Sequence, residues 1–112
     1  IIFTGSQSKI EQIYALSDVV ISSSKKPESF GRAVAEAICM NKPVIATNHG
    51  GVKDIIIENV NGFFFEVGDD KELARNILKS RTLVFDGYSY ISNTFSLENM
   101  VNKTIEVYKR LV

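Results

Sequence analysis

The sequence contains one cysteine, one histidine and no tryptophan. A single cysteine excludes a disulfide within the chain and a zinc site built from several thiolates, and it fits a reducing compartment. A single histidine argues against a metal centre built from several imidazoles. We therefore expect no metal ion, and the cytoplasm is the expected location.

The sequence also lacks net charge and long apolar runs. The 13 Lys and Arg residues balance the 13 Asp and Glu residues, so no overall positive field favours nucleic acid or an anionic membrane. No nucleic-acid partner is expected, and any anion site must be local. The apolar runs are far shorter than the roughly 20 residues that cross a bilayer. With 112 residues, of which 45% are hydrophobic and 23% charged, the chain reads as one ordinary folded domain.

Short apolar runs alternate along the chain with patterns of helical spacing. The β-rich apolar runs predict four strands, at residues 1–4, 19–22, 43–47 and 63–66. Helical spacing and capping residues predict the helices, which begin at Ser8, Asp69 and Ser96 or cover residues 30–41, 53–57 and 81–95. This alternation predicts the α/β class, with a Rossmann-like three-layer α/β/α arrangement around a parallel sheet.

The loop that follows residues 19–22 carries the chemistry. In open α/β sheets, ligands bind at the carboxyl ends of the strands, and here Glu28 and Glu36 flank the start of a predicted helix. The backbone N–H groups of Phe30, Gly31 and Arg32, together with the helix dipole, would form an anion site suited to a diphosphate. A carboxylate on each side would accept hydrogen bonds from pairs of vicinal hydroxyls. This combination describes a nucleotide-sugar site.

Spacing alone leaves a second interpretation open, because a glutamate near a helix N-terminus is favourable through the dipole and Glu36 could be a solvated helix position. The residues themselves are more specific: residues 28–37 read Glu-Ser-Phe-Gly-Arg-Ala-Val-Ala-Glu-Ala, and residues 41–52 read Asn-Lys-Pro-Val-Ile-Ala-Thr-Asn-His-Gly-Gly-Val. Both strings resemble the donor-binding C-terminal domain of the group-one retaining glycosyltransferases, which have the GT-B fold and a Glu-x7-Glu motif. The resemblance extends to residues 2–5, 14–19, 61–63 and 95–96, and so covers nearly the whole chain.

This resemblance implies a role for each residue of the motif. Glu28 would be the catalytic residue and hydrogen-bond the transferred sugar, and Glu36 would bind the ribose hydroxyls. The backbone between them would hold sugar hydroxyls and the diphosphate, at Phe30, Gly31, Arg32 and Ala33. The family transfers the sugar from a nucleotide-diphospho-sugar with net retention, by front-face attack, and needs no protein nucleophile, metal or other cofactor.

The resemblance also implies partners and a missing part. A glycan or lipid-linked acceptor would bind through a second domain, in polysaccharide or lipopolysaccharide synthesis, with peripheral association of the full enzyme at the inner face of the membrane. In the family, an Arg and a Lys that clamp the diphosphate, and the strand that lies beside residues 19–22, would precede Ile1. We therefore expect residues 1–112 to be a nucleotide-sugar-binding domain that is incomplete at its N-terminal side, inactive alone, and completed by a longer chain or a partner.

Several residues keep two interpretations. His49 stands beside Gly50 and Gly51 at the end of a predicted strand and could approach the ligand with them, but a partly exposed turn histidine explains it equally well. Another departure from the family lies in residues 52–54, where Val-Lys-Asp lacks the usual proline; we interpret it as variation in a supporting turn. Cys39 is expected to be a buried, inert thiol.

Two rival functions differ in class from a glycosyltransferase. The first is a non-catalytic, truncated Rossmann-like domain that serves as a fragment or interaction module. The second is a dinucleotide-binding Rossmann domain, which is disfavoured because no Gly-x-Gly-x-x-Gly follows residues 1–4.

Overall fold

The structure is a computed structural model, and it describes residues 5, 9–26, 30–95 and 97–111. Its central feature is a three-stranded parallel sheet in the order β1-β2-β3. The strands are β1 (Val20–Ser22), β2 (Val44–Thr47) and β3 (Gly62–Phe65). Three of the four predicted strands are thereby confirmed, each within a residue of its expected position. The strand predicted at residues 1–4 lies outside the described residues.

Strand β2 lies at the centre of the sheet because all four of its residues are apolar or β-branched and can be buried on both faces. Every side chain from Val44 to Thr47 is buried. The register pairs Val20 with Val44 on one side and Ala46 with Phe64 on the other. Strand β1 has a neighbour on one side only within the described sheet, and Ile21 is 43% exposed there.

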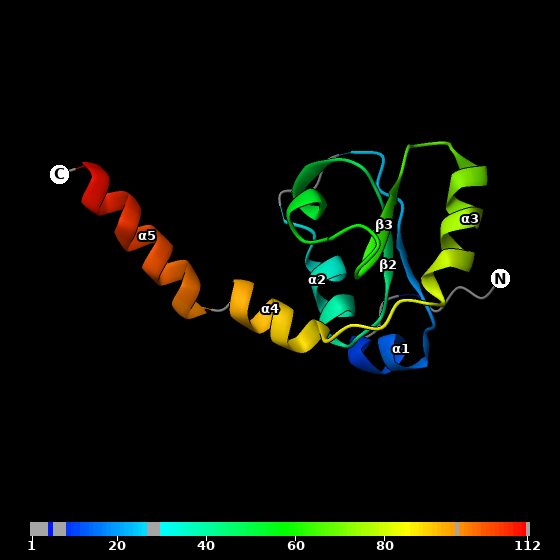
Figure 1. Ribbon diagram of the computed structural model, residues 1–112, viewed down its shortest axis with the longest axis horizontal. Coiled ribbons are helices and arrows are strands. Elements are labelled where there is room, and N and C mark those ends of the chain that lie inside the picture. Colours follow the sequence, from blue (N-terminus) through cyan, green and yellow to red (C-terminus); the bar gives the residue numbers. More distant parts are fainter. Residues whose placement is uncertain (1–4, 6–8, 27–29, 96, 112) are drawn as a thin grey trace.

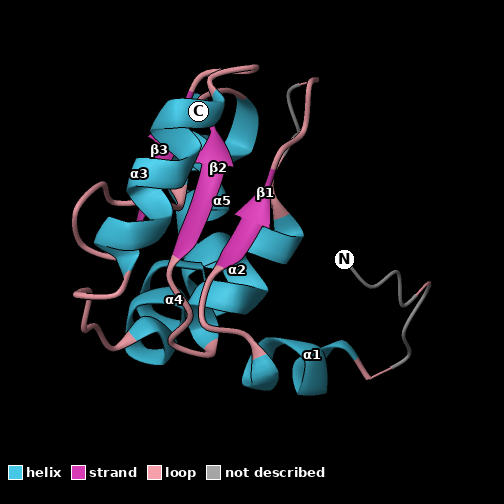
Figure 2. Cartoon of the chain, turned by 90° about the vertical axis from the view of Figure 1, so that its right-hand side faces the viewer, coloured by secondary structure: helices cyan, strands magenta, loops and turns pink. Residues whose placement is uncertain are grey.

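Two helices cover opposite faces of the sheet and give three layers (Figure 1). Helix α2 (Arg32–Cys39) contacts β1 and β2, and α3 (Asp70–Ser80) contacts β2 and β3. The view in Figure 2 shows β1 and β2 pointing the same way, with α1 (Ile10–Leu16) near their amino ends, and β3 is parallel to β2. The core lies between α2 and the sheet, around Val34, Ile38 and Val44. The α/β class and the predicted three-layer arrangement of helices around a parallel sheet are confirmed.

The predicted helices need several corrections at their ends. Helix α1 has Lys9 as its N-cap with no side-chain cap hydrogen bond, and Ser8 lies outside the described residues. The segment predicted as a helix at 53–57 is a 3-10 helix, η1 (Gly50–Asp54), because the two glycines allow the tighter turn to start earlier. Helix α4 (Gly87–Phe95) is shorter than the predicted 81–95.

Asp69 and Ser96 are the residues predicted to cap the last two of the predicted helices that begin with a capping residue. The Asp69 cap of α3 is confirmed, since its side chain accepts from the Glu72 N–H at 3.0 Å. Ser96, the predicted cap of the last helix, lies outside the described residues, and α5 (Leu97–Leu111) follows it directly. Figure 1 shows α5 extending away from the sheet and its covering helices. Its apolar residues Val101 and Ile105 are exposed.

Candidate functional site

The start of α2 lies just beyond the carboxyl end of β1, as the sequence motif predicts. Gly31 is its N-cap, with a left-handed backbone at φ 82°, and Arg32 is the first helical residue. The Ala35 N–H already donates to the Gly31 carbonyl, so the N–H groups of Arg32, Ala33 and Val34 in the first turn have no helical acceptor, and none has another partner among the described residues. This corrects the expectation that the Phe30 amide belongs to the helix terminus.

The 3-10 helix η1, which begins with the glycine pair at 50–51, contacts this helix start through Val52. A Cβ built on Gly31 would lie 2.8 Å from Cγ1 of Val52, a residue of η1. Only glycine allows α2 and η1 to approach this closely with a left-handed backbone at the junction. The fold therefore brings together the Gly31 to Ala33 segment and the Gly50-Gly51 turn, which the sequence separates by nearly 20 residues.

The loop that leads from β1 toward α2 is attached to β2 at Ser24. The Ser24 carbonyl accepts a hydrogen bond from Thr47 Oγ1 at 2.7 Å, and His49 Nε2 lies 2.8 Å from the same oxygen. Because a carbonyl can only accept, the ring hydrogen of His49 must lie on Nε2. Its Nδ1 is buried and has no hydrogen-bond partner among the described residues. His49 thus serves to hold the loop, and its ligand role stays a prediction.

The other end of the same loop is held by aromatic packing. The ring of Phe30 makes an edge-to-face contact with Phe95 of α4, with ring centroids 5.5 Å apart and an interplanar angle of 73°. Phe95 in turn contacts Tyr90 at 6.1 Å. Such pairs contribute about 0.5–1.5 kcal/mol beyond the burial of their surface. The backbone at Phe30 and Gly31 is therefore fixed from the side of α4.

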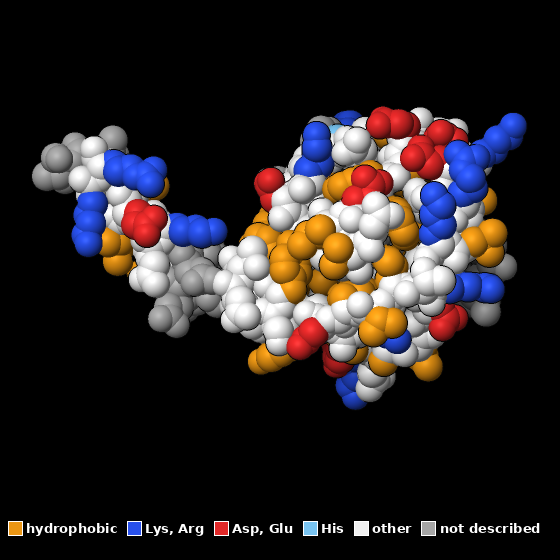
Figure 3. Space-filling model, viewed as in Figure 1, with side chains coloured by type: hydrophobic (Ala, Val, Ile, Leu, Met, Phe, Trp, Pro, Cys, Tyr) orange, Lys and Arg blue, Asp and Glu red, His pale blue; other side chains and the backbone are white. Residues whose placement is uncertain are grey.

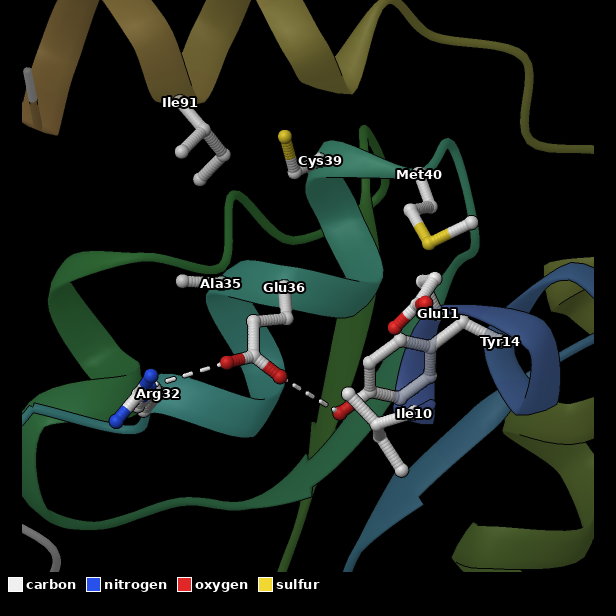
Figure 4. Close-up of a pocket in the computed structure, with 9 residues that line it drawn as sticks. All are labelled: Ile10, Glu11, Tyr14, Arg32, Ala35, Glu36, Cys39, Met40 and Ile91. Atoms are coloured by element: carbon white, nitrogen blue, oxygen red, sulfur yellow. Dashed lines mark hydrogen bonds and ion pairs between the residues drawn. The ribbon is translucent and has the colours of Figure 1, made fainter. Parts of the chain in front are cut away.

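Glu36 lies in the second turn of α2 at the side of a pocket of about 480 Å³ (Figure 4). Its Oε1 is 3.1 Å from Arg32 Nε, and its Oε2 accepts a hydrogen bond from the Tyr14 hydroxyl at 3.3 Å. Burial, followed by the charge of Glu36 and then this hydrogen bond, raises the pKa of Tyr14 above its usual 10.0. Tyr14 therefore stays a neutral donor at physiological pH.

The pocket also corrects the expectation for Cys39. Its thiol was predicted to be buried, but Cys39 is half-buried and lines the pocket together with Met40, which directly follows α2, and Ile91 of α4. Position 39 falls between the inner face of α2, which carries Ile38, and the outer face. A periodic pattern alone does not separate such a boundary position from the core.

The remaining predicted residues are placed as follows. Glu28 lies outside the described residues, so its role stays a prediction. Ala33 and the side chain of Arg32 are exposed, and Gly50 and Gly51 are half-buried. Apolar side chains gather over the middle of the face seen in Figure 3, and side chains of both charges surround them.

Two residues that shape the site were missed by sequence reasoning. Tyr14 falls within the helix predicted to begin at Ser8, and Thr47 within the strand predicted at residues 43–47, with no partner predicted for either side chain. The available signal was general: the hydroxyl of a buried tyrosine or threonine usually has a hydrogen-bond partner. The partner itself could not be read from the sequence, because it lies 22 residues away for Tyr14 and 23 for Thr47.

A family comparison agrees with this geometry. The model of the family described as "Glycosyl transferases group 1" matches residues 1–81. The chain therefore belongs to the group 1 glycosyltransferases, and the resemblance seen in the Glu-x7-Glu motif is confirmed.

The chain is similar in sequence or in structure to several individual proteins. The chain is 33% identical over 90 residues to N-acetyl-alpha-D-glucosaminyl L-malate synthase of Bacillus anthracis, covering 69% of this chain and 23% of that protein. It is 28% identical over 105 residues to lipopolysaccharide 1,2-N-acetylglucosaminetransferase of Salmonella typhimurium, covering 80% and 28%. The structure of Anabaena HepE in complex with UDP and glucose superimposes with a TM-score of 0.79 at 29% identity, covering 97% and 32%. The chain thus spans about a quarter to a third of the length of these relatives.

Helices able to span a membrane and groups of metal-binding side chains are both absent from the described ranges. None of their helices combines the length and the apolar character needed to cross a bilayer. Within them, no group of three or more His, Cys, Asp or Glu side chains is placed to hold a metal ion.

Proposed function

We propose that this chain is the donor-binding part of a retaining glycosyltransferase. The proposed reaction moves a sugar from a nucleotide-diphospho-sugar to a glycan or lipid-linked acceptor, in cell-surface polysaccharide or lipopolysaccharide synthesis. One observation carries the proposal: α2 begins in the segment that follows the carboxyl end of β1, with no side-chain cap hydrogen bond at Gly31 among the described residues, and Glu36 lies one turn further along the helix. The complex of HepE with UDP and glucose supports the class of donor.

The chemistry of the α2 start suits a nucleoside diphosphate. The free amides of Arg32, Ala33 and Val34 point out of the helix, and the positive end of its dipole favours an anion. Arg32 uses Nε on Glu36, and its terminal amino groups, which have no partner in the described part of the chain, can bind a phosphate oxygen. Glu36 carries the acceptor oxygens that a ribose diol requires.

The proposed transfer needs no nucleophile from the protein. The bond between the sugar and the diphosphate breaks, and the acceptor hydroxyl forms the new bond on the same face of the sugar. The departing diphosphate takes the proton of that hydroxyl, and helix N-terminal amides stabilise its growing charge. Glu28 is proposed to bind the transferred sugar at this step. No metal and no other cofactor enters the scheme.

The other parts of the proposal concern the whole protein. Because this chain spans 23% and 28% of the relatives named above, residues outside it would bind the acceptor. The proposed location is the cytoplasm, with peripheral contact at the inner face of the membrane. Residues 1–112 would then form one nucleotide-sugar-binding domain that requires its acceptor domain for activity.

Calorimetry on the protein at its full natural length tests the proposal. UDP-, GDP- and ADP-sugars are titrated against the wild type, Glu36→Ala and a matched control, Glu106→Ala, which changes an exposed glutamate of α5. One donor is expected to bind, and Glu36→Ala should weaken it about tenfold or more, because hydrogen bonds to a charged group contribute about 1.5–3 kcal/mol. Glu106→Ala should bind like the wild type. If every donor bound equally well to the wild type and to Glu36→Ala, the ribose role would be wrong.

A further inference from the structure

Tyr14 places a buried hydroxyl against the carboxylate of Glu36. Its side chain is only 7% exposed, and it comes from α1, a different element from the helix that carries Glu36. The hydroxyl donates to Oε2 across 3.3 Å. Figure 4 shows Glu36 between two partners, with Arg32 on one side and Tyr14 on the other.

The two partners of Glu36 differ in how firmly they hold it. The Arg32 side chain is 89% exposed and lies four residues away on the same helix, so water and salt screen this ion pair. Tyr14 is a rigid ring fixed by burial, and it has few rotamers to lose. Tyr14 is therefore the less mobile of the two partners of the Glu36 carboxylate, although its hydrogen bond of 3.3 Å is longer than the 3.1 Å contact of Arg32.

The hydrogen bonds leave a defined acceptor capacity. An ionised carboxylate has about four acceptor positions on its two oxygens, and Tyr14 and Arg32 occupy one position on each. About two positions stay open on a side chain that is 38% exposed. Two adjacent acceptors with a fixed direction match the two hydroxyl donors of a cis diol.

We propose that Tyr14 is a positioning residue, which orients the Glu36 carboxylate so that both of its oxygens can accept from the 2′- and 3′-hydroxyls of a bound nucleoside diphosphate. This inference rests on the ribose role proposed for Glu36 above. Tyr14 itself does not touch the ligand. Its effect should therefore depend on the presence of those two hydroxyls.

A purely structural role for the same hydrogen bond predicts a different result. If the bond only joined α1 to α2, its loss would weaken every ligand by the same factor. Pairs of ligands that differ only in the ribose diol separate the two cases. UDP, GDP and ADP, each with its 2′,3′-dideoxy analogue, provide such pairs.

The experiment measures the affinity of both members of each pair for the full-length protein, and it uses the base that binds best. Tyr14→Phe keeps the ring and removes the hydroxyl. The wild type should prefer the ribose form. Tyr14→Phe should lower the affinity for the ribose form about three- to tenfold and leave that for the dideoxy form within about twofold.

Tyr90→Phe is the matched control, because it removes another tyrosine hydroxyl, bonded to the Ile55 carbonyl at 2.7 Å, that does not line the pocket. It should leave the ratio of the two affinities unchanged. The same ratio is read independently from ligand-induced shifts in unfolding temperature, which requires only that the bound state be folded.

Each outcome decides between the hypotheses. Equal losses for both ligand forms in Tyr14→Phe, or a Tyr14→Phe protein that does not fold even with ligand, would make the hydroxyl a structural link and overturn the inference. If Glu36→Ala abolished the ribose preference and Tyr14→Phe kept it, the positioning role would fail and the proposed function would stand. If the wild type showed no ribose preference for any base, the ribose role of Glu36 would fail as well.

Discussion

The side-chain oxygen of Asn41 accepts a 2.8 Å hydrogen bond from the backbone N–H of Gly87, 46 residues further along the chain. Asn41 follows the end of α2 and has a left-handed backbone at φ 63°. Gly87 is the first residue of α4. The bond satisfies one of the free N–H groups at the start of α4 and fixes this helix on α2, whose other end carries the candidate site.

Gly87→Ala should strongly destabilise the fold. A Cβ at this position would overlap the carbonyl oxygen of Ile38, a backbone atom of α2 that cannot move without shifting the helix. We expect the free energy of unfolding to fall by about 3 kcal/mol, as measured by urea denaturation. Gly68→Ala is the control: its surroundings are open, so only its left-handed backbone costs energy, about 1–2 kcal/mol. Equal losses in the two variants would mean that α4 does not pack closely on α2.

The strands and the fold class could be predicted because a strand buried on both faces appears in sequence as a continuous apolar run. Residues 44–47 satisfy this rule fully, since all four side chains are buried. The site could be located for a related reason: a parallel sheet directs its loops to one edge, and the motif follows β1. Patterns within a few neighbouring residues were sufficient to predict the strands and the loop that carries the site, because both depend on local geometry.

The unpredicted features depend on contacts between distant segments. Spacing places Tyr14 in a predicted helix, but which carboxylate its hydroxyl meets depends on how α1 packs on α2. The exposure of Cys39 likewise depends on distant segments, since Cys39 lines a pocket together with Ile10 of α1 and Ile91 of α4. The close approach of Val52 in η1 to Gly31 at the start of α2 is likewise a contact between distant segments, which a local pattern does not contain.

Gly31→Ala should reduce both stability and donor binding. The new Cβ would meet Val52 Cγ1 at 2.8 Å, and alanine would have to adopt φ 82°. We expect the free energy of unfolding to fall by about 2 kcal/mol, and the affinity for the donor to fall because the first turn of α2 must shift. Thermal unfolding and calorimetry measure the two effects.

A double-mutant cycle with Val52→Ala separates the two causes in Gly31→Ala. Val52→Ala removes the overlapping methyl group but not the backbone strain. The double variant should therefore be more stable than the sum of the single changes predicts, by about 1 kcal/mol. Strict additivity would contradict a direct clash between positions 31 and 52.

Thr47→Val should loosen the loop that follows β1. It removes the hydroxyl that donates to the Ser24 carbonyl at 2.7 Å and keeps the shape of the side chain. The free energy of unfolding should fall by about 1 kcal/mol. Because the same loop leads to Glu28, the KM for the donor should rise severalfold in steady-state assays of the full-length enzyme.

The control for Thr47→Val is Thr82→Val, which removes an exposed hydroxyl bond to the Lys79 carbonyl at 3.0 Å. This variant should change the free energy of unfolding by less than about 0.5 kcal/mol and leave KM unchanged. A Thr47→Val enzyme with reduced stability and an unchanged KM would restrict the Ser24 contact to a structural role.

Alkaline solution should destabilise the fold through Tyr14. Burial first, and then the charge and hydrogen bond of Glu36, raise the pKa of Tyr14 above its usual 10.0, so the unfolded chain ionises first. The stability from this group is fully present below about pH 10 and is lost as the pH rises through the pKa of the folded state. Burial also raises the pKa of Tyr90, which acts in the same direction.

Urea denaturation from about pH 8 to about pH 11 measures this dependence. Tyr14→Phe and Tyr90→Phe should each make the loss of stability shallower. Glu36→Gln distinguishes the two tyrosines, because the charge of Glu36 contributes to the raised pKa of Tyr14, whereas the pKa of Tyr90 is raised by burial. It should lower the pKa of Tyr14 in an absorbance titration of tyrosinate and flatten the wild-type profile, with a smaller effect once Tyr14 is phenylalanine. If Glu36→Gln flattened the profile equally in the presence and absence of the Tyr14 hydroxyl, the carboxylate would act on another group, and the pairing of Tyr14 with Glu36 would not persist in solution.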